Sequence, residues 1–260
     1  MLGLYDSGLG GLTVLAALRR AGVAADVVYF ADQAHVPYGD RTDAELYGFL
    51  EENFRVLEAQ HADAIVMACN TSCAVAARRG GFPPTRLPVL DLIANAAAAL
   101  REARFARIAV FATAATVRSG AYRRAVAAQA PHIEVVEIAA PALVPLVEGG
   151  LAATDQARDA VDELCRVLPS DVEAIVYGCT HYPLLDGHFA RSLRPGVARI
   201  DPASTQAAAA AALVRRLALA PGRSVTHYLT NGDLALFEAN VRAWTGDQTG
   251  SFAAAVALTR

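Results

Sequence analysis

Short runs of apolar, β-branched residues alternate along the chain with longer stretches in which apolar residues recur every three or four positions. The short runs are typical of buried strands, and the longer stretches are typical of amphipathic helices. Strands are predicted at residues 2–5, 27–30, 64–68, 89–92, 108–111, 133–138, 174–177 and 198–200. This alternation predicts an α/β fold with mostly parallel sheets.

The predicted strands form two sets of four that resemble each other in sequence. Residues 63–69 read DAIVMAC and residues 173–179 read EAIVYGC, at an offset of 110 positions. Upstream, residues 3–6 correspond to residues 109–112 at an offset of 106. The chain is therefore predicted to consist of two similar α/β halves, related by a pseudo-two-fold axis.

Composition and charge are those of an ordinary globular protein. The 260 residues are 54% hydrophobic and 19% charged, and the formal net charge of −3 argues against a nucleic-acid surface. The longest apolar stretch, residues 207–214, is far shorter than the ~20 residues of a membrane span. Residues 1–8 show no secretory signal, and four cysteines in a chain of this length do not indicate a disulfide scaffold. A cytoplasmic protein with reduced thiols is expected.

Cys69 and Cys179 occupy equivalent positions, each at the carboxyl end of a predicted strand. Ligands of open α/β sheets bind at such ends, so two facing halves would place both cysteines beside one cleft. Small polar residues and a helix or turn follow each cysteine, and a helix N-terminus is expected to lower the pKa of the thiol. Inverting a stereocentre needs a base on one face of a planar carbanion and an acid on the other. Two cysteines across a cleft supply both.

The neighbouring turns add further polar groups. Residues 6–11 follow the first strand, and their glycines allow backbone N–H groups to approach a ligand carboxylate at the start of the next helix. Asp6 is expected to hold an ammonium group or to assist Cys69, and His181 is expected to play the matching role beside the second cysteine. The turn after the second strand, residues 37–39, would offer backbone N–H groups and a hydroxyl to the cleft.

Several segments resemble the motifs of glutamate racemases, in the aspartate/glutamate racemase superfamily. They are DSG at residues 6–8, GGLTV at 10–14, VPYG at 36–39, ACNT at 68–71, TVRSG at 116–120 and GCTHYPLL at 178–185. The resemblance runs from residue 3 to about residue 186 and continues at residues 228–233 and Phe237. The last of the six motifs is the specific one.

This resemblance implies an isomerase that interconverts L- and D-glutamate without a cofactor or metal and, in bacteria, supplies D-glutamate for peptidoglycan. It implies two α/β domains, residues 1–92 with 205–260 and residues 93–204, with the active site between them, in a homodimer. The catalytic residues carried over by position are Cys69, Cys179, Asp6 and His181, with Glu148 as a further assisting group. The substrate-binding positions are Asp6, Ser7, Pro37, Tyr38, Gly39, Asn70, Thr71, Thr116, Thr180 and His181.

Other candidate residues are assigned to structural roles. Cys73 lies one helical turn after Cys69, and because no second ligand pair completes a closed zinc site, Cys73 is expected to pack beside the cleft. Cys165 is expected on the core side of a helix. Asp91 and Asp201, again 110 positions apart, are expected to cap helices.

Two alternatives stay open. An aspartate or hydantoin racemase would keep both cysteines and change the walls of the pocket. Residues 94–96 bear on this choice, because they read Ala-Asn-Ala where the glutamate racemases commonly have Glu-Pro-Gly. A catalytically idle binding homologue would have lost a cysteine or its assistants, whereas both cysteines, Asp6 and His181 are present.

Overall fold

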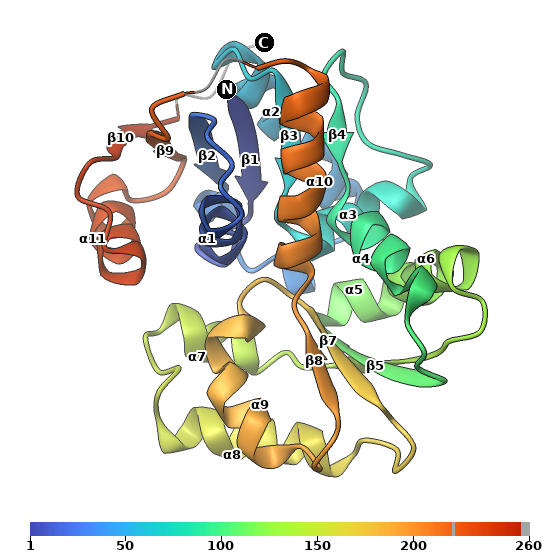
Figure 1. Ribbon diagram of the computed structural model, residues 1–260. Helices are drawn as coiled ribbons and strands as arrows, with labels where there is room; N and C mark the ends of the chain where they lie inside the picture. Colours follow the sequence, from blue (N-terminus) through green and yellow to red (C-terminus); the bar gives the residue numbers. More distant parts are fainter. Residues whose placement is uncertain (220–221, 256–260) are drawn as a thin grey trace.

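Two parallel sheets, one above the other, organise the molecule (Figure 1). The computed structural model describes residues 1–219 and 222–255. Within these residues the first sheet has the order β10-β9-β2-β1-β3-β4 and the second the order β6-β5-β7-β8, and every strand pair is parallel. The strands are β1 (Leu2–Asp6), β2 (Val27–Ala31), β3 (Ala64–Met67), β4 (Val89–Leu90), β5 (Arg107–Ala112), β6 (Glu134–Ala139), β7 (Ala174–Gly178), β8 (Ala198–Ile200), β9 (Thr226–Thr230) and β10 (Ser251–Ala254).

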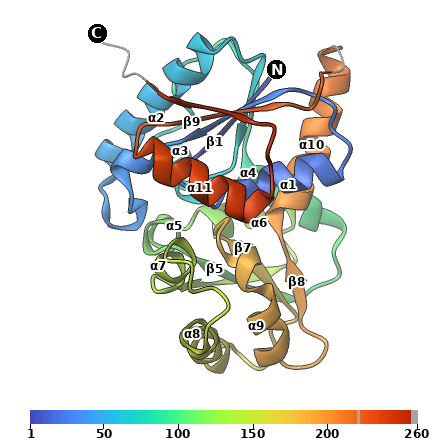
Figure 2. The same ribbon diagram turned by 90° about the vertical axis from the view of Figure 1, so that its left-hand side faces the viewer.

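Helices cover the sheets, as the turned view also shows (Figure 2). They are α1 (Leu12–Arg20), α2 (Asp43–Ala59), α3 (Asn70–Arg78), α4 (Leu92–Ala99), α5 (Ala114–Ser119), α6 (Ala121–Gln129), α7 (Leu143–Glu148), α8 (Asp155–Arg166), α9 (Asp186–Ser192), α10 (Pro202–Arg216) and α11 (Leu234–Thr245). Short 3₁₀ turns are η1 (Gln33–His35), η2 (Tyr38–Asp40), η3 (Leu100–Glu102) and η4 (Tyr182–Leu185). Among the described residues, no helix is long and apolar enough to cross a bilayer.

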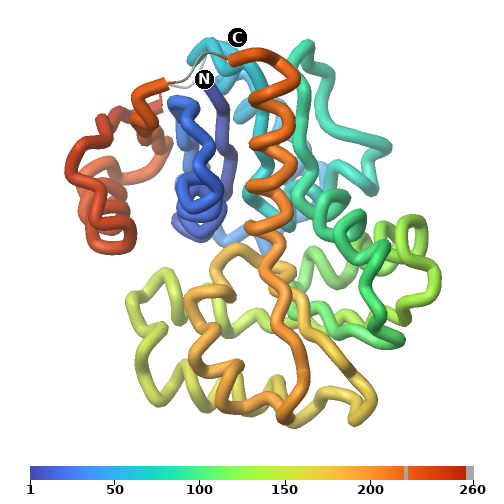
Figure 3. Tube along the Cα trace, in the orientation of Figure 1, coloured from blue at the N-terminus to red at the C-terminus, as the bar shows by residue number. Residues whose placement is uncertain are grey.

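All eight predicted strands are present, and the predicted fold class is confirmed. The order β2-β1-β3-β4 in the first sheet matches β6-β5-β7-β8 in the second, which agrees with the predicted duplication. Strands β9 and β10 were not predicted, and they extend the first sheet beyond β2. The chain passes to the second sheet after α4 and returns from β8 through α10 (Figure 3). The predicted domain breaks at 92/93 and 204/205 stay a prediction, and residues 220–221 and 256–260 of the first domain lie outside the described residues.

The core lies on both faces of the first sheet and continues into the second half. Every residue of β1 is buried: Leu4 packs on the α1 side, and Tyr5 packs on the α2 side. The cluster that holds Tyr5 extends to Val110 of β5 and Val126 of α6, so the two halves share one apolar core. Burial on both faces explains why these strands read as continuous apolar runs.

The structural roles predicted for four residues are confirmed. Asp91 Oδ1 accepts hydrogen bonds from the N–H groups of Ile93 and Ala94 at the start of α4, and Asp201 Oδ1 accepts one from Ala203 at the start of α10. Cys73 is buried in the cluster that holds Tyr5, Cys165 packs from α8 against a separate apolar cluster of the second half, and all four cysteines are free.

Replacing Asp201 by alanine is expected to lower the free energy of unfolding by about 1 kcal/mol, because the first turn of α10 loses its N-cap. Asp201→Asn keeps a capping oxygen and is expected to lose much less. Chemical denaturation of both variants measures the difference. An equal loss in the two variants would contradict the capping role.

Candidate active site

A cavity of about 400 Å³ lies where the carboxyl ends of the two sheets meet, and matching segments of the two halves form its walls. Residues after β1 and β5, after β2 and β6, and after β3 and β7 contribute in pairs. The first half supplies Asp6, Ser7, Val36–Asp40 and Cys69–Thr71, and the second half supplies Thr113, Ala114, Pro141, Val144, Pro145, Glu148 and Cys179–His181. The predicted cleft with a cysteine from each half is therefore present.

Every predicted site residue except Thr116 lines this cavity. The Thr116 hydroxyl is buried 3.0 Å from the Thr113 hydroxyl and 3.4 Å from the Thr71 hydroxyl, so Thr116 supports the wall from behind. Thr113 lies at the cavity instead, and it was not predicted. The repeat contained the signal, because Thr113 stands 106 positions after Ser7, at the offset that relates β1 to β5.

The turn after β1 binds the carboxylates of the protein itself. Asp6 Oδ2 accepts hydrogen bonds from the N–H groups of Gly11 at 2.7 Å and Gly8 at 3.3 Å, and Glu148 Oε1 accepts one from Leu9 at 3.3 Å. The prediction that these N–H groups receive a ligand carboxylate is therefore wrong for these three. The physical reason is that a buried carboxylate needs donors, and Asp6 is fully buried.

Gly10 allows this turn to lie against the segment after β7, which holds Thr180 and His181. A Cβ atom at Gly10 would lie 2.5 Å from Thr180 Oγ1 and from His181 Nδ1, closer than real Cβ contacts. The Thr13 hydroxyl also reaches the carbonyl oxygens of Gly10 at 2.8 Å and Thr180 at 3.1 Å. A side chain at position 10 would therefore collide with Thr180 and His181 and displace them.

Cys179 belongs to a chain of three interacting side chains. Its Sγ lies 3.5 Å from His181 Nδ1, and His181 Nε2 lies 2.6 Å from Glu148 Oε1. Burial alone would lower the pKa of His181, but Cys179 and Glu148 outweigh burial and raise this pKa well above its ordinary value. Burial likewise favours the neutral form of Glu148, and pairing with His181 lowers the pKa of that carboxyl. A protonated His181 can donate to Glu148 with one nitrogen and to the Cys179 sulfur with the other.

Cys69 has different surroundings. Its Sγ lies 3.8 Å from the Ser7 hydroxyl, and Cys69 is the N-cap residue of α3. Burial, followed by the nearby Asp6 carboxylate, raises the pKa of the Cys69 thiol to about 12. The predicted lowering of the Cys69 pKa is therefore wrong, because loss of hydration opposes the thiolate more strongly than the helix N-terminus favours it.

Asp6 is itself perturbed. Burial raises the pKa of its carboxyl, against the opposing effects of His181 and of the Gly11 N–H group. The two cysteines thus have different partners, a carboxyl for Cys69 and a histidine–glutamate pair for Cys179.

The Tyr38 hydroxyl forms its hydrogen bonds within the protein. It donates to the buried carboxylate of Asp32 and lies 2.7 Å from the Tyr5 hydroxyl. Asn53 and Asn231 also donate to Asp32. The prediction that the Tyr38 hydroxyl is offered to the cleft is corrected, because this hydroxyl donates its hydrogen bond to the Asp32 carboxylate.

Two buried polar atoms that belong to lining residues lack a hydrogen-bond partner in the part of the chain that the structure describes: Asp6 Oδ1 and Asn70 Nδ2. Asp6 Oδ1 is an acceptor and Asn70 Nδ2 is a donor. An amino acid carries a partner for each atom: its ammonium group can donate to Asp6 Oδ1, and its carboxylate can accept from Asn70 Nδ2.

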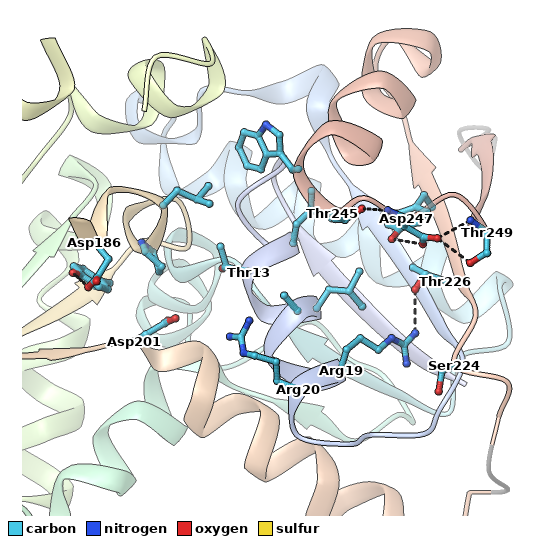
Figure 4. Close-up of a pocket in the computed structure, with 18 of the residues that line it drawn as sticks. Thr13, Arg19, Arg20, Asp186, Asp201, Ser224, Thr226, Thr245, Asp247 and Thr249 are labelled. Atoms are coloured by element: carbon cyan, nitrogen blue, oxygen red, sulfur yellow. Dashed lines mark hydrogen bonds between the residues drawn. The ribbon is translucent and has the colours of Figure 1, made fainter. Parts of the chain in front are cut away.

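A second cavity, of about 760 Å³, lies between α1, α11 and the segment after β7 (Figure 4). Thr13, Arg19, Arg20 and Asp247 are among its lining residues. Its described lining residues include neither cysteine nor histidine, and several of its charged groups are paired within the protein, such as Arg199 with Asp186 at 2.7 Å. Both cysteines of the repeat lie in the smaller cavity. No cluster of three His, Cys, Asp or Glu side chains suited to a metal ion occurs within residues 1–219 and 222–255.

Comparison with known proteins identifies the family. The profile of the family described as Asp/Glu/Hydantoin racemase matches residues 14–212. The chain belongs to this family. A relative named glutamate racemase, from Gloeobacter violaceus, is 42% identical over 250 residues, which cover 94% of this chain and 92% of the relative.

Solved structures of racemases support the same assignment. The glutamate racemase of Thermus thermophilus in complex with β-chloro-D-alanine is 36% identical, with a TM-score of 0.85 over 99% of this chain and 96% of that chain. The glutamate racemase of Francisella tularensis in complex with D-glutamate is 25% identical, with a TM-score of 0.86 over 99% and 97%. The resemblance predicted from the motifs is confirmed, and with it the two-sheet fold and the enzyme class, an isomerase.

The departure from the racemase motif at residues 94–96 lies away from the site. These residues belong to α4, and none of them lines the cavity. Asn95 Nδ2 donates to Gln206 Oε1 at 2.6 Å, and Gln206 in turn donates to the carbonyl oxygens of Met67 and Leu90. Residues 94–96 therefore take part in helix packing and lie outside the cavity walls.

Glu148→Gln is expected to lower the pKa of His181, because the variant removes the carboxylate that pairs with the imidazolium. NMR titration of the His181 ring signals, in the wild type and the variant, measures this pKa. The exposed Glu163→Gln is the control and should leave the titration unchanged.

The same pair makes stability depend on pH. The folded pKa of His181 lies above 6.5, so its contribution is full below pH 6.5 and is lost as the pH rises through the folded pKa. The folded pKa of Glu148 lies below 4.5, so its contribution is present above pH 4.5 and is lost as the pH falls through the folded pKa. The wild type should therefore exceed Glu148→Gln in unfolding free energy most between pH 4.5 and 6.5. A difference that grows towards alkaline pH would refute this assignment.

Proposed function

We propose that the protein interconverts L- and D-glutamate without a cofactor, and that Cys69 and Cys179 exchange the α-proton as a pair of acid and base. The observation that supports this most strongly is the presence of two free cysteines at equivalent positions of the two halves, in the walls of one cavity. The names of the relatives support glutamate as the substrate, and one solved relative is a complex with D-glutamate.

The unpartnered groups of the cavity suit an amino acid. Asp6 Oδ1 accepts from the ammonium group, and Asn70 Nδ2 donates to a carboxylate. The hydroxyl groups of Ser7, Thr71 and Thr180 supply further hydrogen bonds. These contacts hold the α-carbon between the two sulfur atoms, so that each sulfur faces one side of it.

In one direction, a thiolate removes the α-proton and becomes a thiol, and the substrate becomes a planar carbanion. The opposite thiol then gives its proton to the other face of the carbanion and becomes a thiolate. One C–H bond breaks and one forms, and the total number of protons on the site is unchanged. The reverse direction uses the same two groups in exchanged roles.

The neighbours of each cysteine prepare it for its role. A protonated His181, held by Glu148, stabilises a thiolate at Cys179 through charge and a hydrogen bond. The raised pKa of the Cys69 thiol keeps it protonated and ready to donate. Burial raises the pKa of the Asp6 carboxyl, which brings it closer to that of a thiol and lets Asp6 accept the proton of Cys69 when Cys69 must act as the base.

The resemblance to glutamate racemases implies the wider role. We assign the D-glutamate to peptidoglycan synthesis, the protein to the cytoplasm, and the active form to a homodimer. Sedimentation of the purified protein tests the last assignment.

With L-glutamate in D₂O, the wild type is expected to place deuterium on the α-carbon while the circular dichroism of the substrate decays to zero. Cys69→Ser and Cys179→Ser should each lower kcat by about 10²–10⁴-fold, because a serine hydroxyl is a far weaker acid than a thiol. Cys165→Ser, in α8 outside the cavity, is the matched control and should retain activity.

The same assay separates the alternatives. Inversion of L-aspartate or of a hydantoin, without inversion of glutamate, would replace the substrate assignment. Wild-type turnover in either of the two cysteine variants would defeat the two-base mechanism. Glutamate binding without any exchange would favour an idle binding homologue.

A further inference from the structure

The Asn70 side chain is held by a residue of the other half. Asn70 is the first residue of α3, and its Oδ1 accepts a hydrogen bond from the Tyr122 hydroxyl of α6 at 2.6 Å. Helices α3 and α6 are in contact (Figure 1). Tyr122 is 1% exposed and Asn70 is 3% exposed, so water does not compete for this bond. The bond occupies the acceptor end of the amide and leaves Nδ2 as the end without a protein partner among the described residues.

The direction of the amide decides what Asn70 can bind. With Oδ1 on Tyr122, Nδ2 presents N–H donors to a ligand. The reversed amide would present a carbonyl oxygen, which repels a carboxylate. It would also leave the buried phenolic proton of Tyr122 without its acceptor, which is unfavourable in a site closed to water.

We propose that Tyr122 is a positioning residue that fixes the donor end of Asn70 toward the cavity, where it binds a carboxylate of the substrate. This inference rests on the proposed function. Tyr122 does not line the cavity itself, and it acts through Asn70. The second half thereby sets the ligand specificity of a residue that belongs to the first half.

Tyr122→Phe tests the proposal, because it removes the hydroxyl and keeps the ring. The KM for L-glutamate is expected to rise about tenfold while kcat stays within about threefold, since a substrate-binding contact is loosened and the cysteines are untouched. Tyr228→Phe is the matched control. Tyr228 is also buried, and its hydroxyl donates to Asp247 at 3.0 Å, away from the cavity. An unchanged KM in Tyr122→Phe would overturn the proposal.

A double-mutant cycle separates positioning from a loss of packing. If Tyr122 acts through Asn70, then Tyr122→Phe changes the KM of an Asn70→Ala protein by less than about twofold. Effects that add fully in the double variant would show that Tyr122 acts by another route and would overturn the proposal.

A measurement without turnover keeps the two proposals separate. The chain has five asparagines, so selective ¹⁵N-asparagine labelling gives few side-chain amide signals, and those of Asn70 are the ones absent from Asn70→Ala. They are expected to shift in Tyr122→Phe and to stay in place in Tyr228→Phe. Unchanged Asn70 signals in Tyr122→Phe would overturn the positioning role, whether or not the wild type turns over glutamate. A wild type that leaves glutamate unchanged would reject the proposed function alone.

Discussion

The site depends on the close contact between the glycine-rich turn after β1 and the segment after β7. The side chains of Thr180 and His181 fill the space where a side chain at Gly10 would lie, so these two residues pack directly against the main chain of the first turn. Thr13 reaches the carbonyl of Thr180, and the N–H group of Leu9 reaches Glu148, which in turn holds His181. The contact therefore joins the two halves within a few residues of Cys179.

Most of the fold could be predicted, because parallel strands that are buried on both faces leave continuous apolar runs in the sequence. Strands β9 and β10 lack this signal. The sequence of β9 reads THYLT, and β10 lies at the sheet edge with exposed residues. Strand β9 pairs with β2, which lies about 200 residues earlier in the chain, and β10 pairs with β9. Pairing at this distance leaves no local pattern.

The site was likewise predictable only in part. Which residues reach the cavity follows from where strands end, so Cys69 and Cys179 could be placed from the repeat alone. What each group does there depends on neighbours distant in the sequence. The Tyr38 hydroxyl donates a hydrogen bond to Asp32, which also accepts one from Asn231, near the C-terminal end of the chain. The pKa of Cys69 likewise follows from burial that only the packed structure reveals.

For the proposed racemisation, the unequal surroundings of the two cysteines have a thermodynamic consequence. L- and D-glutamate have equal free energies in water, so the equilibrium constant between them is one. The Haldane relation then requires kcat/KM to be the same in both directions for any catalyst of this reaction. A duplicated scaffold with Asp6 on one side and a His181–Glu148 pair on the other can favour one direction in kcat only if KM changes in that direction by the same factor. Sequence divergence between the two halves can therefore change how tightly each enantiomer is bound. The ratio of the two kcat/KM values stays at one.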